Sequence, residues 1–111
     1  MNDARLRRLD EQHQHENETA RRRIDLAETA IAQYRSQVHR VQESFFQLAA
    51  HHGVADDPAF RAELQRLSDD TDQKVHAVGR MIAELSEEYD AMTRRQTEAR
   101  DLLLAQQRET D

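Results

Sequence analysis

Two stripes of apolar residues, separated by a short polar turn near the middle of the chain, most constrain the fold. In each stripe the apolar residues recur at alternating spacings of three and four, which places them along one face of an α-helix. The pattern therefore predicts an all-α fold, an antiparallel, coiled-coil-like two-helix hairpin. The residues of this predicted hairpin seam are Ile24, Ile31, Tyr34, Val38, Val41, Leu48, Val75, Val78, Ile82, Leu85, Tyr89 and Met92, with Ala27, Phe45, Ala99 and Leu103 in the same register.

The turn is predicted at about residues 53–57 from the residues that flank it. Glycine can adopt the left-handed conformation that ends a helix. An aspartate followed by proline favours a new helix, because the carboxylate caps free N–H groups and proline lacks the N–H that the first turn leaves unpaired. The residues assigned to the turn are His51, His52, Gly53, Asp57 and Pro58.

Long helices are favoured because the 111 residues include only two glycines and one proline. We expect a single domain over residues 1–111, with helices at about 3–52 and 58–108. One alternative interrupts the second helix, because its stripe takes two successive steps of four around Thr71, a stutter of the kind that unwinds a coiled coil. The residues there favour caps and turns, so a break at 68–72 is the competing prediction.

The net negative charge of the chain argues against nucleic-acid binding. The net charge is -6, and the whole excess of acid lies in residues 53–111, where fourteen acids face seven arginines and one lysine. An acidic surface repels phosphate. The basic run at residues 21–23 supports a nucleic-acid accessory role only as the weakest alternative, since acidic residues surround it and no aromatic residues alternate with it. No apolar stretch is long enough for membrane insertion.

The histidines and acids do not form a recognisable metal or catalytic motif. His13 and His15 are two residues apart and His51 and His52 are adjacent, so neither pair has the spacing of three or four that one ion needs on a helix. A calcium loop starting at Asp70 would lack its required glycine and final glutamate. With no cysteine and no glycine-rich phosphate loop, we expect no metal, no cofactor and no catalytic residues, and hence no enzyme.

Apolar residues beside the seam exceed what a two-helix hairpin can cover. Domains with so small a core are marginal unless they associate, so we expect a helical protein partner or a second copy to pack on these residues. The residues predicted to bind the partner are Leu26, Ala30, Phe45, Phe46, Ala49, Met81, Leu102 and Leu104.

A helical hairpin of about a hundred residues with glycine at its turn resembles the WXG or ESAT-like group of type VII secretion proteins. His51-His52-Gly53 stands where that group has Trp-x-Gly. Tyr89 is followed four residues later by Thr93, where the group's export motif has Asp or Glu. The chain is more similar to the small helical accessory proteins of LXG toxins, and Phe45-Phe46 near the turn suits their partner surface.

The resemblance implies a bacterial, chaperone-like adaptor without catalytic activity. It would bind the helical N-terminal domain of an LXG toxin, together with a second small helical protein, and help to target the toxin to the type VII secretion system. The alternative is a self-associating antiparallel coiled-coil adaptor of a phage or mobile element with no role in secretion. We expect a cytoplasmic protein, or one exported without a signal peptide as part of a complex.

Overall fold

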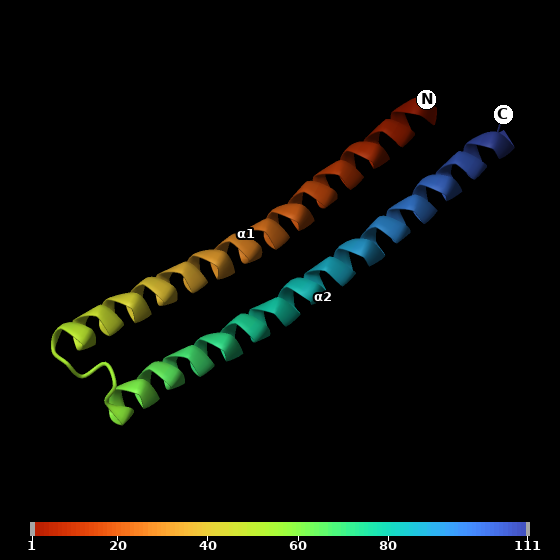
Figure 1. The fold of residues 1–111 in the computed structure, drawn as a ribbon. Coiled ribbons are helices and arrows are strands. Elements are labelled where there is room, and N and C mark those ends of the chain that lie inside the picture. The colour runs from red at the N-terminus through yellow and green to blue at the C-terminus, as the bar shows by residue number, and fades with distance from the viewer. Residues whose placement is uncertain (1, 111) are drawn as a thin grey trace. The chain divides into compact units, whose positions relative to one another are not determined.

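The computed structural model describes residues 2–110 and shows an all-α fold (Figure 1). Helix α1 runs over Asn2–His51 and helix α2 over Pro58–Thr110, and the residues between 2 and 110 include no strand. Each helix continues for about fifty residues because its interior contains no proline, and only α2 contains a glycine, Gly79. The predicted two-helix hairpin and the position of its turn are confirmed.

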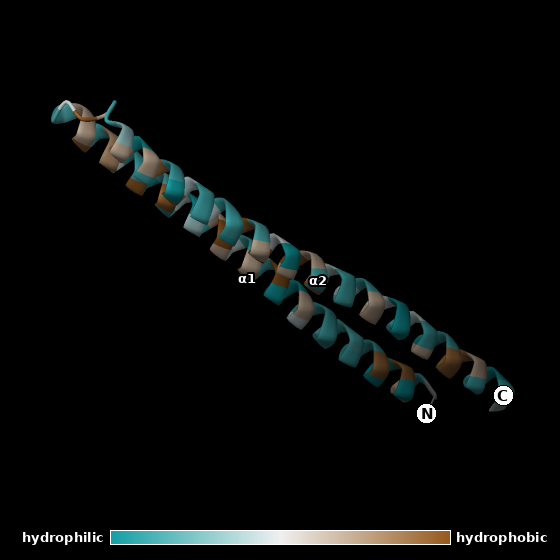
Figure 2. Ribbon diagram, turned by 90° about the horizontal axis from the view of Figure 1, so that it is seen from below, coloured by the Kyte–Doolittle hydropathy of each residue, from teal (hydrophilic) through white to brown (hydrophobic). Residues whose placement is uncertain are grey.

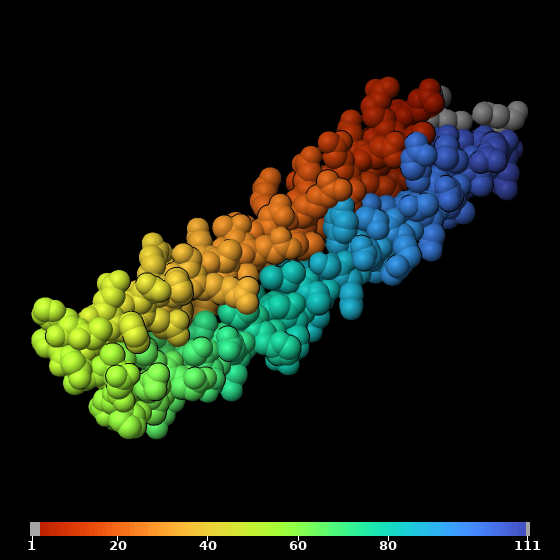
Figure 3. All heavy atoms as spheres, viewed as in Figure 1, coloured from red at the N-terminus to blue at the C-terminus, as the bar shows by residue number. Residues whose placement is uncertain are grey.

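Contacts within the chain divide it into two units, each with a stretch of both helices. In the terminal unit, described residues 2–26 of α1 lie beside 82–110 of α2, and the turn unit is Ala27–Met81 (Figure 3). The helices are antiparallel, and cross-helix pairs define the register of the terminal unit. Two such pairs are Asp10 with Arg100 and Arg21 with Tyr89, and in each pair the two residue numbers sum to 110. The prediction of one domain stays a prediction.

The end of α1 is a Schellman motif. Gly53 has a φ of 72° and its N–H donates to the Ala50 carbonyl, 3.1 Å away, while the Val54 N–H donates to the Ala49 carbonyl, 2.9 Å away. Asp57 then caps α2, because its Oδ1 accepts a hydrogen bond from the Ala59 N–H at 3.4 Å. Both helix ends that meet at the turn thus satisfy orphan backbone groups locally.

Helix α2 passes without interruption through residues 68–72, so the alternative with a break there is wrong. The turn-prone side chains are satisfied inside the helix. Thr71 is 8% exposed and donates its hydroxyl to the Leu67 carbonyl at 2.7 Å, while Asp69 accepts from Gln65 at 2.9 Å. Asp70 pairs with Lys74 at 3.0 Å. Partners four residues away remove the preference of these residues for a turn.

The seam is a narrow line of half-buried apolar residues rather than an enclosed core. Of the apolar side chains that the structure describes, only Ala49 is buried, at 5% exposed. In Figure 2, hydrophobic residues form short bands on helices that are otherwise mostly hydrophilic. The half-buried seam residues are Ile24, Ile31, Tyr34, Val38, Val75, Val78, Ile82, Leu85, Tyr89 and Met92.

Val41 and Leu48 depart from the predicted seam, with 45% and 56% of their surfaces exposed. Toward the turn, half-buried Gln42 and buried Ala49 take their places. The physical reason is a pair of matched stutters. Helix α2 takes two steps of four through Thr71, and α1 does the same from Tyr34 to Gln42, which rotates its packing face away from the original three-and-four line.

Polar residues enter the seam of the terminal unit. Gln96 is 9% exposed, and its Nε2 donates at 3.4 Å to the His13 carbonyl and to Glu16 Oε2. Asn17 is half-buried, and its buried Oδ1 has no hydrogen-bond partner. A desolvated oxygen without a donor destabilises the hairpin. Polar residues therefore make this part of the seam less stable than an apolar packing layer would.

The two glycines provide a matched test of the helices. We expect Gly53→Ala to lower the free energy of unfolding by about 1 kcal/mol, because the left-handed φ strains a residue that has a Cβ. Gly79→Ala should raise it by about 0.5–1 kcal/mol, because alanine favours the helix interior and a Cβ there would meet no atom within 4 Å. Urea denaturation followed by circular dichroism measures both, and changes of the same sign would contradict the assignment.

Asn17 provides a test of the seam. Replacing it in Asn17→Leu removes the unpaired buried oxygen and adds apolar contact, so the free energy of unfolding should rise by about 1–3 kcal/mol. The control is Gln14→Leu on the exposed face, which should change stability by less than about 0.5 kcal/mol. Equal effects of the two substitutions in urea denaturation would contradict the position of Asn17 in the seam.

Candidate partner-binding surfaces

Three large apolar side chains of the turn unit form an exposed row on α1. Val41, Phe45 and Leu48 are spaced by four and three residues, so they share one helix face, and they are 45–56% exposed. We call them the turn-side row. Phe46 is also exposed but lies on the other flank, where it lines a separate hollow with Leu64 of α2. The row therefore belongs to α1 alone.

Uncharged polar residues lie beside the turn-side row. On the same side of α1 its neighbours include Gln37 and Ser44. Glu43 and Gln47 line the separate hollow of Phe46 instead. Depletion of charge around large apolar and aromatic residues is typical of the centre of a protein interface.

Most residues predicted to bind a partner are exposed, and one is not. Leu26, Ala30, Phe45, Phe46, Met81 and Leu102 are exposed, and Leu104 is half-buried. Ala49 is instead the most buried apolar side chain that the structure describes, so it cannot form a partner contact. The rotated packing face of α1 near the turn explains this, because it brings Ala49 into the seam in place of Leu48.

The terminal unit has a groove of about 550 Å³ between its two helices. Its floor is apolar and includes Ala20 and Met92. Charged residues of both signs line it, and we call this feature the terminal groove. These charged residues include Glu16 and Arg23 on α1 and Glu88 and Arg95 on α2. A second hollow on the same face of the unit is lined by Leu9, Ala99, Leu102 and Leu103.

The charges along the terminal groove are largely unpaired. Glu16 accepts hydrogen bonds from Gln12 at 3.0 Å and from Gln96 at 3.4 Å. Within the described part of the chain, Arg23, Glu88 and Arg95 make no hydrogen bond or ion pair. They are therefore free to contact another molecule.

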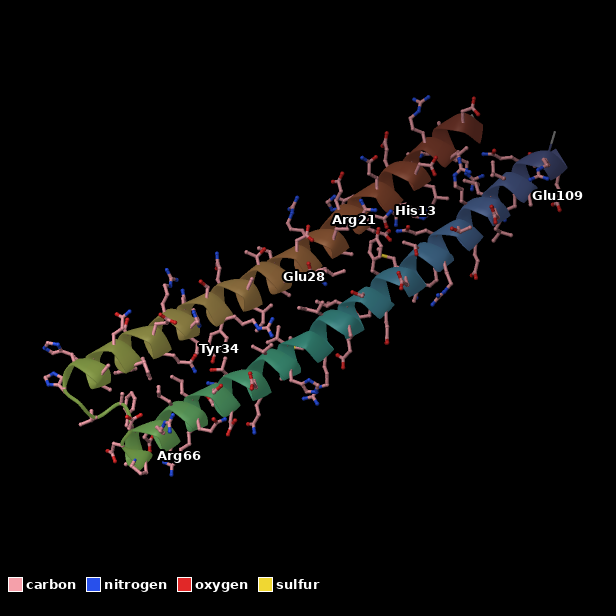
Figure 4. The ribbon with its side chains drawn as sticks, in the orientation of Figure 1. His13, Arg21, Glu28, Tyr34, Arg66 and Glu109 are labelled. Atoms are coloured by element: carbon pink, nitrogen blue, oxygen red, sulfur yellow. The ribbon has the colours of Figure 1, made fainter. Side chains whose placement is uncertain are left out.

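Arginines 21–23 do not form one basic patch. Arg21 points toward α2 in Figure 4, where its Nε donates to the Tyr89 hydroxyl at 3.0 Å and its guanidinium lies 5.7 Å from the ring centroid. Arg23 lines the terminal groove instead. The run is thus divided between two sides of α1, which leaves no concentrated site for a phosphate.

One lysine of the turn unit has a shifted pKa. The hydrogen bond and charge of Asp70, with a smaller contribution from Tyr34, raise the pKa of Lys74 above its usual value. Tyr34 points toward α2 in Figure 4. Because Lys74 is fully in water, this contact is a surface ion pair and not a site of proton transfer.

Other candidate sites find little support. Residues 2–110 contain no group of three or more His, Cys, Asp or Glu side chains placed to hold a metal ion. Neither described helix contains a window long and apolar enough to cross a membrane. The residues that sequence reasoning missed are those along the terminal groove. Their signal was a spacing of seven residues next to the seam, from Glu16 to Arg23 and from Glu88 to Arg95.

Comparisons with known proteins add no assignment to this geometry. Protein-family models, curated proteins and solved structures all gave no significant match to the chain.

Proposed function

We propose that this protein is a non-catalytic helical adaptor that binds another helical protein through the turn-side row. The observation that carries the proposal is the exposure of Val41, Phe45 and Leu48 in one row that the hairpin itself leaves uncovered. A partner helix with apolar residues at the same spacing can pack against such a row, which is a common mode of helix recognition.

The free energy that the row can contribute to binding indicates how much surface the partner covers. Burying the exposed half of each side chain in the row contributes about 1 kcal/mol, or about 3 kcal/mol in all. A micromolar complex requires about 8 kcal/mol. The partner therefore extends beyond the row, and Val54 in the turn, 44% exposed, is a further large apolar residue in the same unit.

The candidate partner is the helical N-terminal domain of an LXG toxin. The hairpin fold and the apolar row near the turn support this choice, together with the resemblance of the chain to LXG-toxin accessory proteins. In this role the adaptor covers apolar toxin helices and forms with them, and with a second small helical protein, the composite end that the type VII secretion system recognises. The adaptor stays in the cytoplasm or leaves the cell within that complex.

A second candidate function is a self-associating adaptor with no role in secretion. The alternating charges along the terminal groove favour it, because they suit a second copy of the same chain. The two candidates use different units of the protein, so substitutions in one unit test each of them separately.

Charged substitutions in the turn-side row test the proposed function. Phe45→Glu and Leu48→Glu place a carboxylate at the centre of the docking face, where desolvation costs several kcal/mol, so binding to the toxin domain should weaken by at least about a hundredfold. Helicity should stay unchanged, because both positions are exposed in the hairpin. Co-purification and isothermal calorimetry measure binding, and circular dichroism measures helicity.

Two further variants serve as controls for this experiment. Gln47→Glu adds the same charge one position from Leu48 and should bind like the parent protein. Ile31→Glu places the charge in the half-buried seam and should unfold the hairpin. Parent-like binding by folded Phe45→Glu and Leu48→Glu would show that the docking face lies elsewhere.

A further inference from the structure

We propose that the terminal groove binds a second copy of this chain, related to the first by a two-fold axis that runs along the helices. The inference is independent of the turn-side row. It rests on the arrangement of charge and apolar residues along the two sides of the groove.

The residues along each side follow a seven-residue period. On α1 the row is Leu9, Glu16 and Arg23, and on α2 it is Leu102, Arg95 and Glu88. In the antiparallel register of the terminal unit, where cross-helix pairs sum to 110, these residues stand at matching levels. Leucine lies across from leucine, Glu16 across from Arg95, and Arg23 across from Glu88.

Such a pattern is complementary to itself. A second copy turned by 180° about the long axis places its α1 segment over α2 of the first copy, without a shift along the helices. Arg23 of each copy then faces Glu88 of the other, and Glu16 faces Arg95. Four pairs of opposite charge form across the interface, and the unpaired state of Arg23, Glu88 and Arg95 within one hairpin leaves them available for it.

The floor of the groove fits the same rotation. Ala20 and Met92 stand at nearly the same level of the register, so the rotation sets the small side chain of one copy over the large one of the other. Leu9 and Leu102, which line the second hollow, meet in the same way. Alternation of small and large residues lets facing layers interdigitate.

Charge also explains why the occupant is a second copy. Copies of a chain with a net charge of -6 repel one another, so they associate where the local charge is balanced. The four charged residues that the rotation pairs are two arginines and two glutamates, with a net charge of zero. Arg5 and Arg8, which also line the second hollow, stand at the levels of Gln106 and Leu103 of the other copy, so the rotation brings no two arginines together there. The alternation of charge along the groove matches the rotated copy.

The size of the face indicates a weak dimer. The two hollows extend over residues 5–23 of α1, a length of about 28 Å, and the face is about 20 Å wide, the width of two helices. This area corresponds to a small interface of less than about 1,200 Å² in total. We therefore expect a dissociation constant in the micromolar range that rises with salt, because exposed ion pairs are screened.

A charge swap tests both the partner and the axis. Sedimentation equilibrium of the full chain at low salt should show a monomer–dimer equilibrium. Arg23→Glu and Glu88→Arg should each weaken dimerisation by at least about tenfold, because each brings like charges together. The double variant Arg23→Glu/Glu88→Arg exchanges the signs and should restore the affinity to within about threefold of the parent.

The matched control is Arg22→Glu/Glu87→Arg, which reverses neighbouring charges outside the groove and should leave the dimer unchanged. Circular dichroism verifies that every variant is folded. A parent chain that stays monomeric at about 100 µM overturns the proposal, and so does a double variant as weak as the single ones or a control that weakens equally. Arg23→Glu should still bind the toxin domain through the turn-side row, so the outcomes of the two proposals are separable.

Discussion

Two helices side by side touch along one line, and this limit on burial governs the rest of the structure. A residue on either helix has most of its circumference in water, so even good seam residues such as Ile24 and Ile82 are only half-buried. Ala49 reaches 5% exposure because the rotated packing face of α1 brings it into the seam near the turn. With so little apolar surface removed from water, small features have large effects on stability, among them the cap at Asp57 and an unpaired oxygen in the seam.

The polar positions of the seam show how the hairpin combines stability with register. Thr71 and Gln96 are the most buried polar side chains that the structure describes. Thr71 bonds within α2, while Gln96 reaches across to α1. A polar side chain that forms hydrogen bonds across the seam favours one alignment of the two helices over alignments shifted along the helix axis. This preference has a cost in stability. Asn17 adds to the cost without a visible hydrogen bond in return.

The surface that the hairpin cannot cover differs between the two units. The turn unit exposes a row of large apolar residues, which suits a helix of another protein. The terminal unit exposes a groove with alternating charges, which suits a copy of itself. An adaptor that pairs with itself at one unit and with a client at the other would present two client-binding rows per dimer, and two weak contacts then act together.

The sequence alone was sufficient to predict the helices and the turn because both depend on local rules. Spacings of three and four define a helix face, and Gly53 and Asp57-Pro58 have conformational preferences of their own. The tertiary structure decided which face packs. Matched stutters in α1 and α2 rotate the contact line, so Val41 and Leu48 become exposed and Ala49 buried, which neither stripe reveals by itself.

The groove charges likewise acquired meaning only from the antiparallel register. In the sequence, Glu16 and Arg23 are far from Glu88 and Arg95. Taken one at a time, these charged residues indicate only a solvent-exposed helix face. The fold brings them to the sides of one groove at matching levels. Local propensity determined the elements of this protein, whereas the surfaces available to partners depended on how two long helices align, because that alignment sets which side chains share a face.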